Sequence, residues 1–352
     1  MGPAIQAAPA TLVFLHGIKG SLLDDDKGER GWLTVAQVAA LRTPNLALPV
    51  LWGPEGQQRD GWKPVGILKS LPVVENFLEK KIYSVFCDAL EKSGRPYRYF
   101  AYDWRRDLNE TSALLEKFLE TVKAESGGVA PTVVGHSMGG MLTLAVLRRR
   151  PELFSSVALV GSPLRGGIGF LPDLHEGVRT GLNAGILSPE VLATFPSVYT
   201  FFPLDSERIV RDERGRPMRT NFYRLDTWRG MGLAMYAEGR ERPQAWDDFI
   251  EKALASAQTF RKSMLQGSAA TVPVLVVRSE RHRTLAAMRR DGGRKPKWDF
   301  SAEPKEDGDG RVLSQDALPP ANLGEVRVMA TDGEHDALLD DANVQKTLFA
   351  LP

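Results

Sequence analysis

The chain of 352 residues is 43% hydrophobic and 25% charged, which is typical of a globular protein with a substantial core. Its 45 basic and 44 acidic side chains leave a formal net charge of +1, so the charge gives no reason to expect nucleic acid or an acidic partner. The single cysteine, Cys87, excludes an internal disulfide framework. Its apolar neighbours predict a buried structural thiol.

The first ten residues lack the positive region and the apolar stretch of a secretory signal. No apolar run approaches the length needed to span a membrane. The default expectation is therefore a cytoplasmic protein, with a processed secreted form as the alternative.

Short apolar runs then begin to alternate with amphipathic patterns. The run at 11–15 ends in His16-Gly17 and predicts a buried parallel strand. Residues 21–72 show weak periodicity among scattered tryptophans, glycines and prolines, so a long irregular excursion is expected. Helices are predicted over 76–92 and 109–125, with a strand over 97–104 between them.

The stretch from 132 to 140 combines an apolar run with Gly-His-Ser-Met-Gly, and an apolar helical pattern follows at once. Strand, sharp turn and helix form the context of a G-x-S-x-G nucleophile elbow. It would hold Ser137 at a strained turn, where Gly135 and Gly139 let the backbone pass closely. The alternative is a glycine-rich connection in another kind of α/β protein.

The second half predicts a strand over 156–160, a helix over 246–265, strands over 272–277 and 325–330, and a last helix over 336–348. Residues 283–320 are polar and rich in turns. The strand–helix rhythm is lost between 164 and 242, where glycine, proline and aromatic residues gather, which indicates an inserted cap. We therefore expect an α/β-hydrolase fold, a mostly parallel sheet with helices on both faces. Its core would span 11–163 and 243–352, and its cap 164–242.

A serine hydroxyl needs a neighbouring base to become a nucleophile. In the α/β-hydrolase chain order the base comes last, after the acid, and His335 between the last strand and helix fits that place. A loop histidine that caps the final helix is the alternative reading. His282 is the second candidate for the base.

The acid that orients the base has two candidates. Glu280 directly follows a predicted strand, and Asp309 lies in a glycine-punctuated acidic turn that is also consistent with a solvated loop. Spacing alone leaves both open. The backbone amides of Met138, at the start of the elbow helix, and of Ile18, in the loop after the first strand, are predicted to bind an oxyanion.

Other chemistries have little support. The chain has no G-x-x-x-x-G-K-[ST] phosphate loop, no H-E-x-x-H and no C-x-x-C, so neither a cofactor nor a metal is expected.

Five segments together resemble the lecithin:cholesterol acyltransferase family of α/β-hydrolases, which includes lysosomal phospholipase A2 and phospholipid:diacylglycerol acyltransferases. The match covers nearly the whole chain, and its most specific parts are Tyr-Asp-Trp-Arg and Gly-Asp-Gly-x-Val. In order, the segments are His16-Gly17-Ile18-Lys19-Gly20-Ser21, Tyr102-Asp103-Trp104-Arg105, Gly135-His136-Ser137-Met138-Gly139-Gly140, Gly161-Ser162-Pro163 with Gly166-Gly167 and the later Ser197-Val198-Tyr199 and Pro203, and Gly308-Asp309-Gly310-Arg311-Val312. Two positions depart from the family pattern: His16 stands where Pro is more frequent, and Arg311 replaces the usual Thr.

The resemblance implies Asp309, not Glu280, as the acid, with His335 as the base and Ser137 as the nucleophile. It also implies a structural role for 103–105, with Trp104 buried and Asp103 and Arg105 paired to other loops. The family's cap carries disulfides, which one cysteine cannot form, so the cap here must be held by packing.

The resulting hypothesis is a serine-dependent lipase, esterase or acyltransferase that acts on lipid-like esters of the phospholipid or acylglycerol class. An alcohol acceptor would replace water in a transferase. Trp52 and Trp62 are candidates for a peripheral membrane contact, with a packed loop as the alternative. The alternative function is a non-catalytic hydrolase-fold protein that binds a hydrophobic ligand or a partner.

Overall fold

The computed structural model describes residues 9–70, 82–204, 206–290, 298–301 and 303–352. Its centre is a six-stranded sheet in which every neighbouring pair is parallel. The predicted α/β fold is therefore confirmed. The strands are, in spatial order, β18 (Arg327–Thr331), β14 (Val274–Ser279), β9 (Ser156–Val160), β8 (Thr132–His136), β1 (Leu12–Leu15) and β7 (Tyr97–Phe100).

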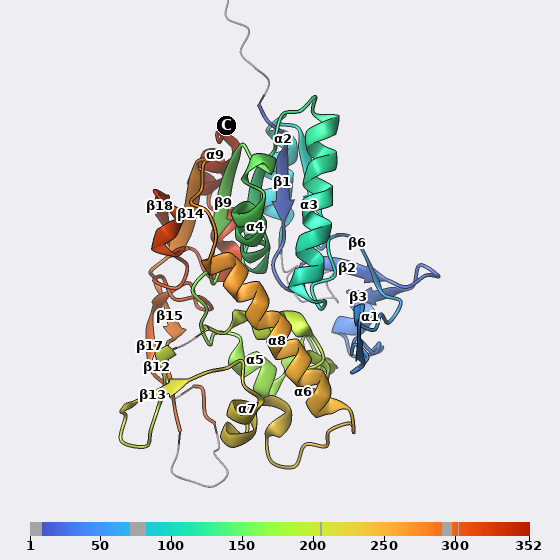
Figure 1. Cartoon of the computed structure of the whole chain (residues 1–352). Coiled ribbons are helices and arrows are strands. Elements are labelled where there is room, and N and C mark those ends of the chain that lie inside the picture. Colours follow the sequence, from blue (N-terminus) through green and yellow to red (C-terminus); the bar gives the residue numbers. More distant parts are fainter. Residues whose placement is uncertain (1–8, 71–81, 205, 291–297, 302) are drawn as a thin grey trace, which may run out of the picture.

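Helices cover both faces of this sheet (Figure 1). Because side chains alternate along a strand, Val13 and Leu15 of β1 join one apolar cluster, and Leu12 and Phe14 join another. The first cluster includes α3 (Leu108–Glu125), α4 (Met138–Arg149) and α8 (Trp246–Leu265), and the second includes α2 (Ser84–Lys92) and α9 (Ala342–Phe349). Cys87 of α2 is fully buried, as expected, and burial raises the pKa of its thiol to about 11.

The expectation of an irregular excursion over 21–72 is wrong for much of that stretch. It contains a three-stranded antiparallel sheet, a two-stranded ribbon and one helical turn. These strands are two to five residues long. They are too short to show a clear alternation of apolar and polar residues in the sequence. They are β2 (Ser21–Asp24), β3 (Arg30–Trp32) and β6 (Lys63–Ile67) in the sheet, β4 (Trp52–Gly53) and β5 (Gly56–Gln57) in the ribbon, and α1 (Val35–Val38) is the helical turn.

Other boundaries differ by a few residues. The predicted helix over 76–92 is a helix from Ser84, and part of its predicted beginning lies outside the described residues. The last predicted helix is divided into a 3-10 turn, η5 (His335–Asp340), and α9. The polar stretch after β14 includes an antiparallel ribbon of β15 (His282–Leu285) and β17 (Lys305–Gly308).

The stretch 164–242 forms short elements that lie beyond the carboxyl ends of the sheet strands, in the lower half of Figure 1. The division into core and cap stays a prediction. The elements are α5 (Leu171–Glu176), β10 (Val178–Thr180), β11 (Asn183–Leu187), α6 (Pro189–Leu192), η2 (Pro196–Phe201), β12 (Ser206–Arg211), β13 (Pro217–Thr220), α7 (Leu225–Met231) and η3 (Ala234–Tyr236). The remaining short elements are η1 (Pro151–Leu153), β16 (Met288–Arg289) and η4 (Ala321–Leu323).

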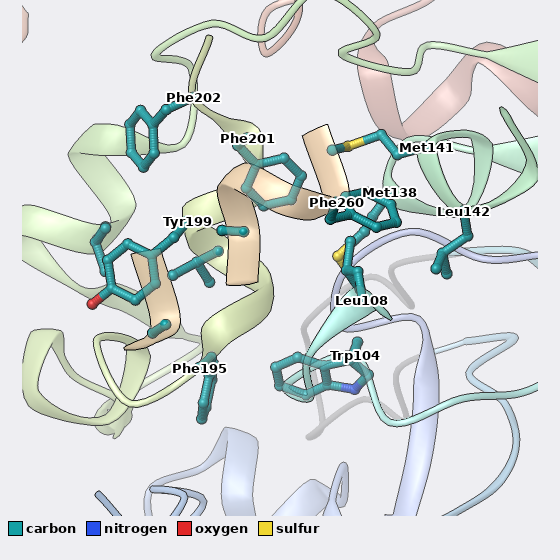
Figure 2. Packing of buried hydrophobic residues seen from close by; sticks show 14 of the residues in the cluster. Trp104, Leu108, Met138, Met141, Leu142, Phe195, Tyr199, Phe201, Phe202 and Phe260 are labelled. Atoms are coloured by element: carbon teal, nitrogen blue, oxygen red, sulfur yellow. The ribbon is translucent and has the colours of Figure 1, made fainter. Parts of the chain in front are cut away.

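Aromatic packing joins this stretch to the sheet layer. Figure 2 shows Met138 and Met141 of α4 near Phe201 of η2 and Phe260 of α8. Trp104 is fully buried and meets Phe195 edge to face, with ring centroids 5.6 Å apart. Burial of large aromatic side chains thus attaches this stretch to the sheet layer.

Arg105 is the centre of a buried ionic cluster. Its Nη2 lies 2.7 Å from Asp103 and its Nη1 lies 2.5 Å from Asp60, in the loop before β6. Nη1 also donates to the carbonyl of Leu46. The predicted structural role agrees with these contacts for Arg105, which fastens the 21–72 segment to the sheet. The Asp103 carboxylate bonds Arg105 itself, so its predicted pairing with another loop is not seen in the part of the chain that the structure describes. Within the described residues, no helix has the length and apolarity that a membrane crossing requires.

Candidate active site

Ser137 stands at the turn between β8 and α4, in a backbone conformation that a serine rarely adopts (φ 52°, ψ −120°). The turn is tight on both sides. A Cβ on Gly135 would lie 2.6 Å from the Gly140 backbone, and one on Gly139 would lie 2.6 Å from the carbonyl oxygen of His16. The structure therefore has the strained turn that the elbow motif predicts, with glycines where side chains would collide.

His335 connects Ser137 to Asp309. Its Nε2 lies 3.0 Å from Ser137 Oγ, and its Nδ1 lies 2.8 Å from Asp309 Oδ2. Because the carboxylate can only accept, Nδ1 carries the proton and Nε2 is free to accept one from the serine. Three residues separated by up to 198 positions thus form one continuous hydrogen-bonded chain.

The turn around Asp309 holds its carboxylate in place. Oδ1 accepts from the amides of Arg311 at 2.9 Å and Val312 at 2.6 Å, which leaves Oδ2 for the histidine. Arg311 fits in this turn because the turn uses its backbone amide. Its side chain bonds Asp173 of α5 instead.

Electrostatics favour a charged carboxylate beside the imidazole. Burial raises the pKa of Asp309, but the His335 charge and hydrogen bond and the two amides outweigh it and hold that pKa below its usual value. For His335, burial lowers the pKa, yet the Asp309 charge and hydrogen bond outweigh burial and raise it above the ordinary 6.5. The pair is therefore arranged to stabilise an imidazolium.

The two alternative residues point elsewhere. Glu280 is half exposed, and its carboxylate bonds Ser314 at 3.1 Å and Arg278 at 2.6 Å. His282 Nε2 lies 2.8 Å from the carbonyl oxygen of Asp332. The structure therefore brings Asp309, not Glu280, to His335, and His335, not His282, to Ser137.

The loop after β1 lies directly against the serine. A Cβ on Gly17 would be 2.9 Å from Ser137 Cβ, so only glycine allows this approach. The Gly17 amide donates to the hydroxyl of Tyr83 at 2.8 Å, which makes the following amide, that of Ile18, the candidate oxyanion donor on this loop. The other predicted donor, Met138, is the first residue of α4, where helix amides are free to bind an anion.

His16 keeps this loop on the sheet. Its ring stacks on Tyr102 at 4.1 Å, its Nε2 accepts from the Tyr102 amide, and its Nδ1 lies 2.7 Å from the Gly17 carbonyl. Burial lowers its pKa to about 3, so the ring stays neutral. A neutral histidine thus supports this loop.

Ser137 and His335 open onto a cavity of about 400 Å³. Its walls combine the loop after β1, the small N-terminal sheet and the 164–242 stretch. They are more apolar than polar, with charged side chains such as Lys19, Asp173 and Arg179 beside the apolar ones. The apolar lining residues include Ile18, Trp32, Ile168, Phe170, Phe201 and Val312. The volume and lining suit a small organic ester or the reacting part of a larger one.

The two tryptophans proposed for membrane contact pack against the protein. The Trp62 ring covers Gly31, where an added Cβ would lie 2.6 Å from it, and Trp52 approaches Phe249 with centroids 6.2 Å apart. Both side chains are half-buried. These contacts favour the packed-loop alternative.

Tyr83 is a site residue that sequence reasoning missed. It precedes α2 and bonds groups 66 and 53 positions away. No local pattern marks such a residue, because its partners come from the ends of two sheet strands.

A model of the alpha/beta hydrolase fold family matches residues 86–286, which is more than half of the chain. The chain belongs to the alpha/beta hydrolase family. Together with the parallel sheet, the match confirms the predicted fold class.

Among curated relatives, phospholipase A(1) LCAT3 of Arabidopsis thaliana is 33% identical over 89 residues, 23% of this chain and 20% of that protein. A triacylglycerol lipase of Pseudarthrobacter phenanthrenivorans is 31% identical over 84 residues, 23% of this chain and 25% of the lipase. The uncharacterized protein YJR098C of Saccharomyces cerevisiae is 27% identical over 140 residues, 38% of this chain and 21% of that protein. The chain thus spans about a fifth to a quarter of the length of these curated relatives.

A solved structure described as the Tle4-Tli4 complex resembles this alpha/beta hydrolase over 98% of both chains, with a TM-score of 0.61 and 14% identity. At this identity the likeness concerns the fold alone.

Proposed function

We propose that this protein is a serine-dependent lipase, esterase or acyltransferase that acts on lipid-like esters through an acyl-enzyme. The observation that carries the proposal is the hydrogen-bonded chain from Ser137 Oγ through His335 to Asp309, which opens onto a cavity. Nucleophile, base and orienting acid in this geometry are the arrangement that activates a serine.

In the acylation step, Ser137 Oγ attacks the ester carbonyl carbon while its proton passes to His335 Nε2. Asp309 stabilises the imidazolium through the Nδ1 hydrogen bond. The oxygen of the tetrahedral intermediate becomes negative, and the amides of Ile18 and Met138 are the donors we assign to it. Collapse of the intermediate breaks the ester bond, and the imidazolium gives its proton to the leaving alcohol.

In the second step, water or an alcohol attacks the acyl-enzyme and His335 takes its proton. Release of Ser137 Oγ then regenerates the hydroxyl. Water yields a carboxylic acid, whereas an alcohol yields a new ester, so hydrolase and transferase share every residue up to this point.

The lipid-like substrate class is supported by three findings. The apolar part of the cavity wall suits an acyl chain, the sequence segments resemble the lecithin:cholesterol acyltransferase family, and two relatives are named a phospholipase and a triacylglycerol lipase. We further propose that 164–242 acts as the cap of this site, since Ile168, Phe170 and Phe201 contribute to the cavity wall.

Replacement of the serine tests the central claim. Ser137→Ala should reduce hydrolysis of a short p-nitrophenyl ester by about 10³-fold or more. Ser263→Ala, which removes a hydroxyl that donates to the Phe260 carbonyl of its own helix, is the matched control and should retain the rate. A fluorophosphonate probe should label Ser137 in the folded protein. A folded Ser137→Ala protein that keeps most of the rate would contradict the assignment of Ser137 as the nucleophile. An inactive parent whose serine is not labelled would favour a non-catalytic binding protein.

Vesicles that present different ester lipids separate the substrate classes. Release of fatty acid from phospholipid or acylglycerol, measured with and without a long-chain alcohol, identifies both the head group and the acceptor. Formation of the alcohol's ester at the expense of free acid would assign a transferase. Cleavage of soluble esters alone would contradict the lipid substrate.

A further inference from the structure

The hydroxyl of Tyr83 joins two of the segments that form the candidate active site. It lies 2.8 Å from the Gly17 amide nitrogen and 2.8 Å from His136 Nδ1. Tyr83 is 5% exposed and His136 is 4% exposed, and both contribute to the wall of the cavity, so loss of their bond would leave two largely buried polar groups unpaired. Nothing in the proposed chemistry of Ser137 itself requires either side chain.

His136 extends this contact to a third segment. Its Nε2 lies 3.0 Å from the carbonyl oxygen of His335, which can only accept, so Nε2 carries a proton. A second proton on Nδ1 would leave the Tyr83 hydroxyl hydrogen without this acceptor. Burial, followed by the repulsion from His335, lowers the pKa of His136 to about 4, consistent with a neutral ring.

One arrangement of protons satisfies every group. Gly17 N–H donates to the Tyr83 oxygen, Tyr83 O–H donates to His136 Nδ1, and His136 Nε2–H donates to the His335 carbonyl. Burial raises the pKa of Tyr83 above its usual value, so the hydroxyl keeps its proton. The hydroxyl therefore both accepts and donates a hydrogen bond within the protein.

The three segments held in this way carry the three parts of the proposed machinery. Gly17 precedes Ile18, His136 precedes Ser137, and the carbonyl belongs to His335 itself. We propose that Tyr83 and His136 are positioning residues that fix the oxyanion loop, the nucleophile and the base relative to one another. The inference rests on the proposed function of Ser137. It concerns geometry, because a shift of about 1 Å in a reacting group costs roughly a hundredfold in rate.

Tyr83→Phe removes only the hydroxyl and tests the proposal. We expect kcat for a p-nitrophenyl ester to fall about ten- to hundredfold with KM changed by less than about threefold. A trifluoromethyl ketone, which forms an oxyanion adduct with an active serine, should bind more weakly by a similar factor. The control is Tyr99→Phe, which likewise removes only a hydroxyl, here one that donates to Glu91 of α2. This variant should keep the kcat of the parent and its affinity for the trifluoromethyl ketone.

A double-mutant cycle asks whether the two residues act as one unit. His136→Gln removes the acceptor of the Tyr83 hydroxyl, and Tyr83→Phe/His136→Gln removes both partners. If the residues act together, the double variant loses about the same factor as the worse single variant. Losses that multiply would show independent roles and overturn the proposal. If Tyr83→Phe does not fold, His136→Gln carries the same kinetic test.

The readouts separate this inference from the proposed function. An inactive parent that the fluorophosphonate does not label would defeat the proposed function. An active parent with a folded Tyr83→Phe variant of unchanged kcat and inhibitor affinity would defeat only the positioning role. The pH midpoint of kcat/KM should stay the same in Tyr83→Phe, because His335 and Asp309 remain paired.

Discussion

Asp309 bonds His335 twice. Its Oδ2 lies 2.8 Å from His335 Nδ1, and its carbonyl oxygen accepts from the His335 backbone amide at 2.8 Å. The side-chain bond orients the ring, whereas the backbone bond fixes the start of η5 from which the ring projects. Orientation of the imidazole therefore depends on the turn around Asp309 as a whole.

Asp309→Asn should abolish most activity while the protein stays folded. The amide can offer a donor to Nδ1 and so favour the tautomer whose Nε2 carries the proton, which cannot accept from Ser137. We expect kcat/KM for a p-nitrophenyl ester to fall by about 10³- to 10⁴-fold. Glu280→Gln is the control and should lose less than about threefold, because Glu280 bonds Ser314 and Arg278. Equal losses, or the reverse order, would contradict the assignment.

The pH dependence follows from the raised pKa of His335. The base must be neutral, so kcat/KM should rise with pH through a midpoint above 6.5. Loss of the Asp309 charge should move the midpoint of the residual activity in Asp309→Asn to lower pH. Rate profiles of both proteins between about pH 5 and pH 9 check this. A parent midpoint below 6.5 would show that a different group controls the rate.

Gly17→Ala should damage the site without unfolding the protein. The new Cβ would lie 2.9 Å from Ser137 Cβ and 3.3 Å from His136 Nδ1, so the loop must move away from the nucleophile. We expect kcat to fall about tenfold to a hundredfold. Gly66→Ala adds the same methyl group where nothing lies within 4 Å and should leave kcat unchanged. Full activity of Gly17→Ala would mean that the loop takes no part in the reaction.

Arg105→Ala should destabilise the protein. Removal of this fully buried guanidinium leaves Asp60 and Asp103, which are 13% and 10% exposed, without their cation. We expect the free energy of unfolding to fall by about 3–5 kcal/mol in urea titrations. Arg59→Ala removes a side chain that is 73% exposed and pairs with Glu110, so it should cost less than about 1 kcal/mol. Similar costs for both would show that the cluster adds no stability.

Local sequence was sufficient to predict the strand, turn and helix around Ser137. The glycines at 135 and 139 and the apolar runs on either side act within a few residues, so their pattern is visible in the chain. The same holds for the buried strands β1, β8 and β9, whose continuous apolar runs mark them as central. Short strands within 21–72 carry too few residues for such a pattern.

Which carboxylate lies beside the imidazole of His335 was decided only by tertiary structure. From spacing, Glu280 and Asp309 were equivalent, and the family resemblance favoured Asp309. In the fold, β17 pairs antiparallel with β15, so the end of β17 lies beside the start of β15. Asp309 directly follows β17 and there meets His335. Glu280 meanwhile bonds Ser314 and Arg278. The catalytic roles of these residues stay predictions, but the geometry that such roles need is present.

The sequence by itself determined the sheet, the turn at Ser137 and the positions of the candidate residues at strand ends, because local sterics and hydrophobic periodicity act over short distances. Only the tertiary structure decided which carboxylate meets the imidazole, how the cavity is closed, and that Tyr83 joins Gly17 to His136. Those contacts join residues 26 to 66 positions apart, and their partners are chosen by how the sheet and its loops pack.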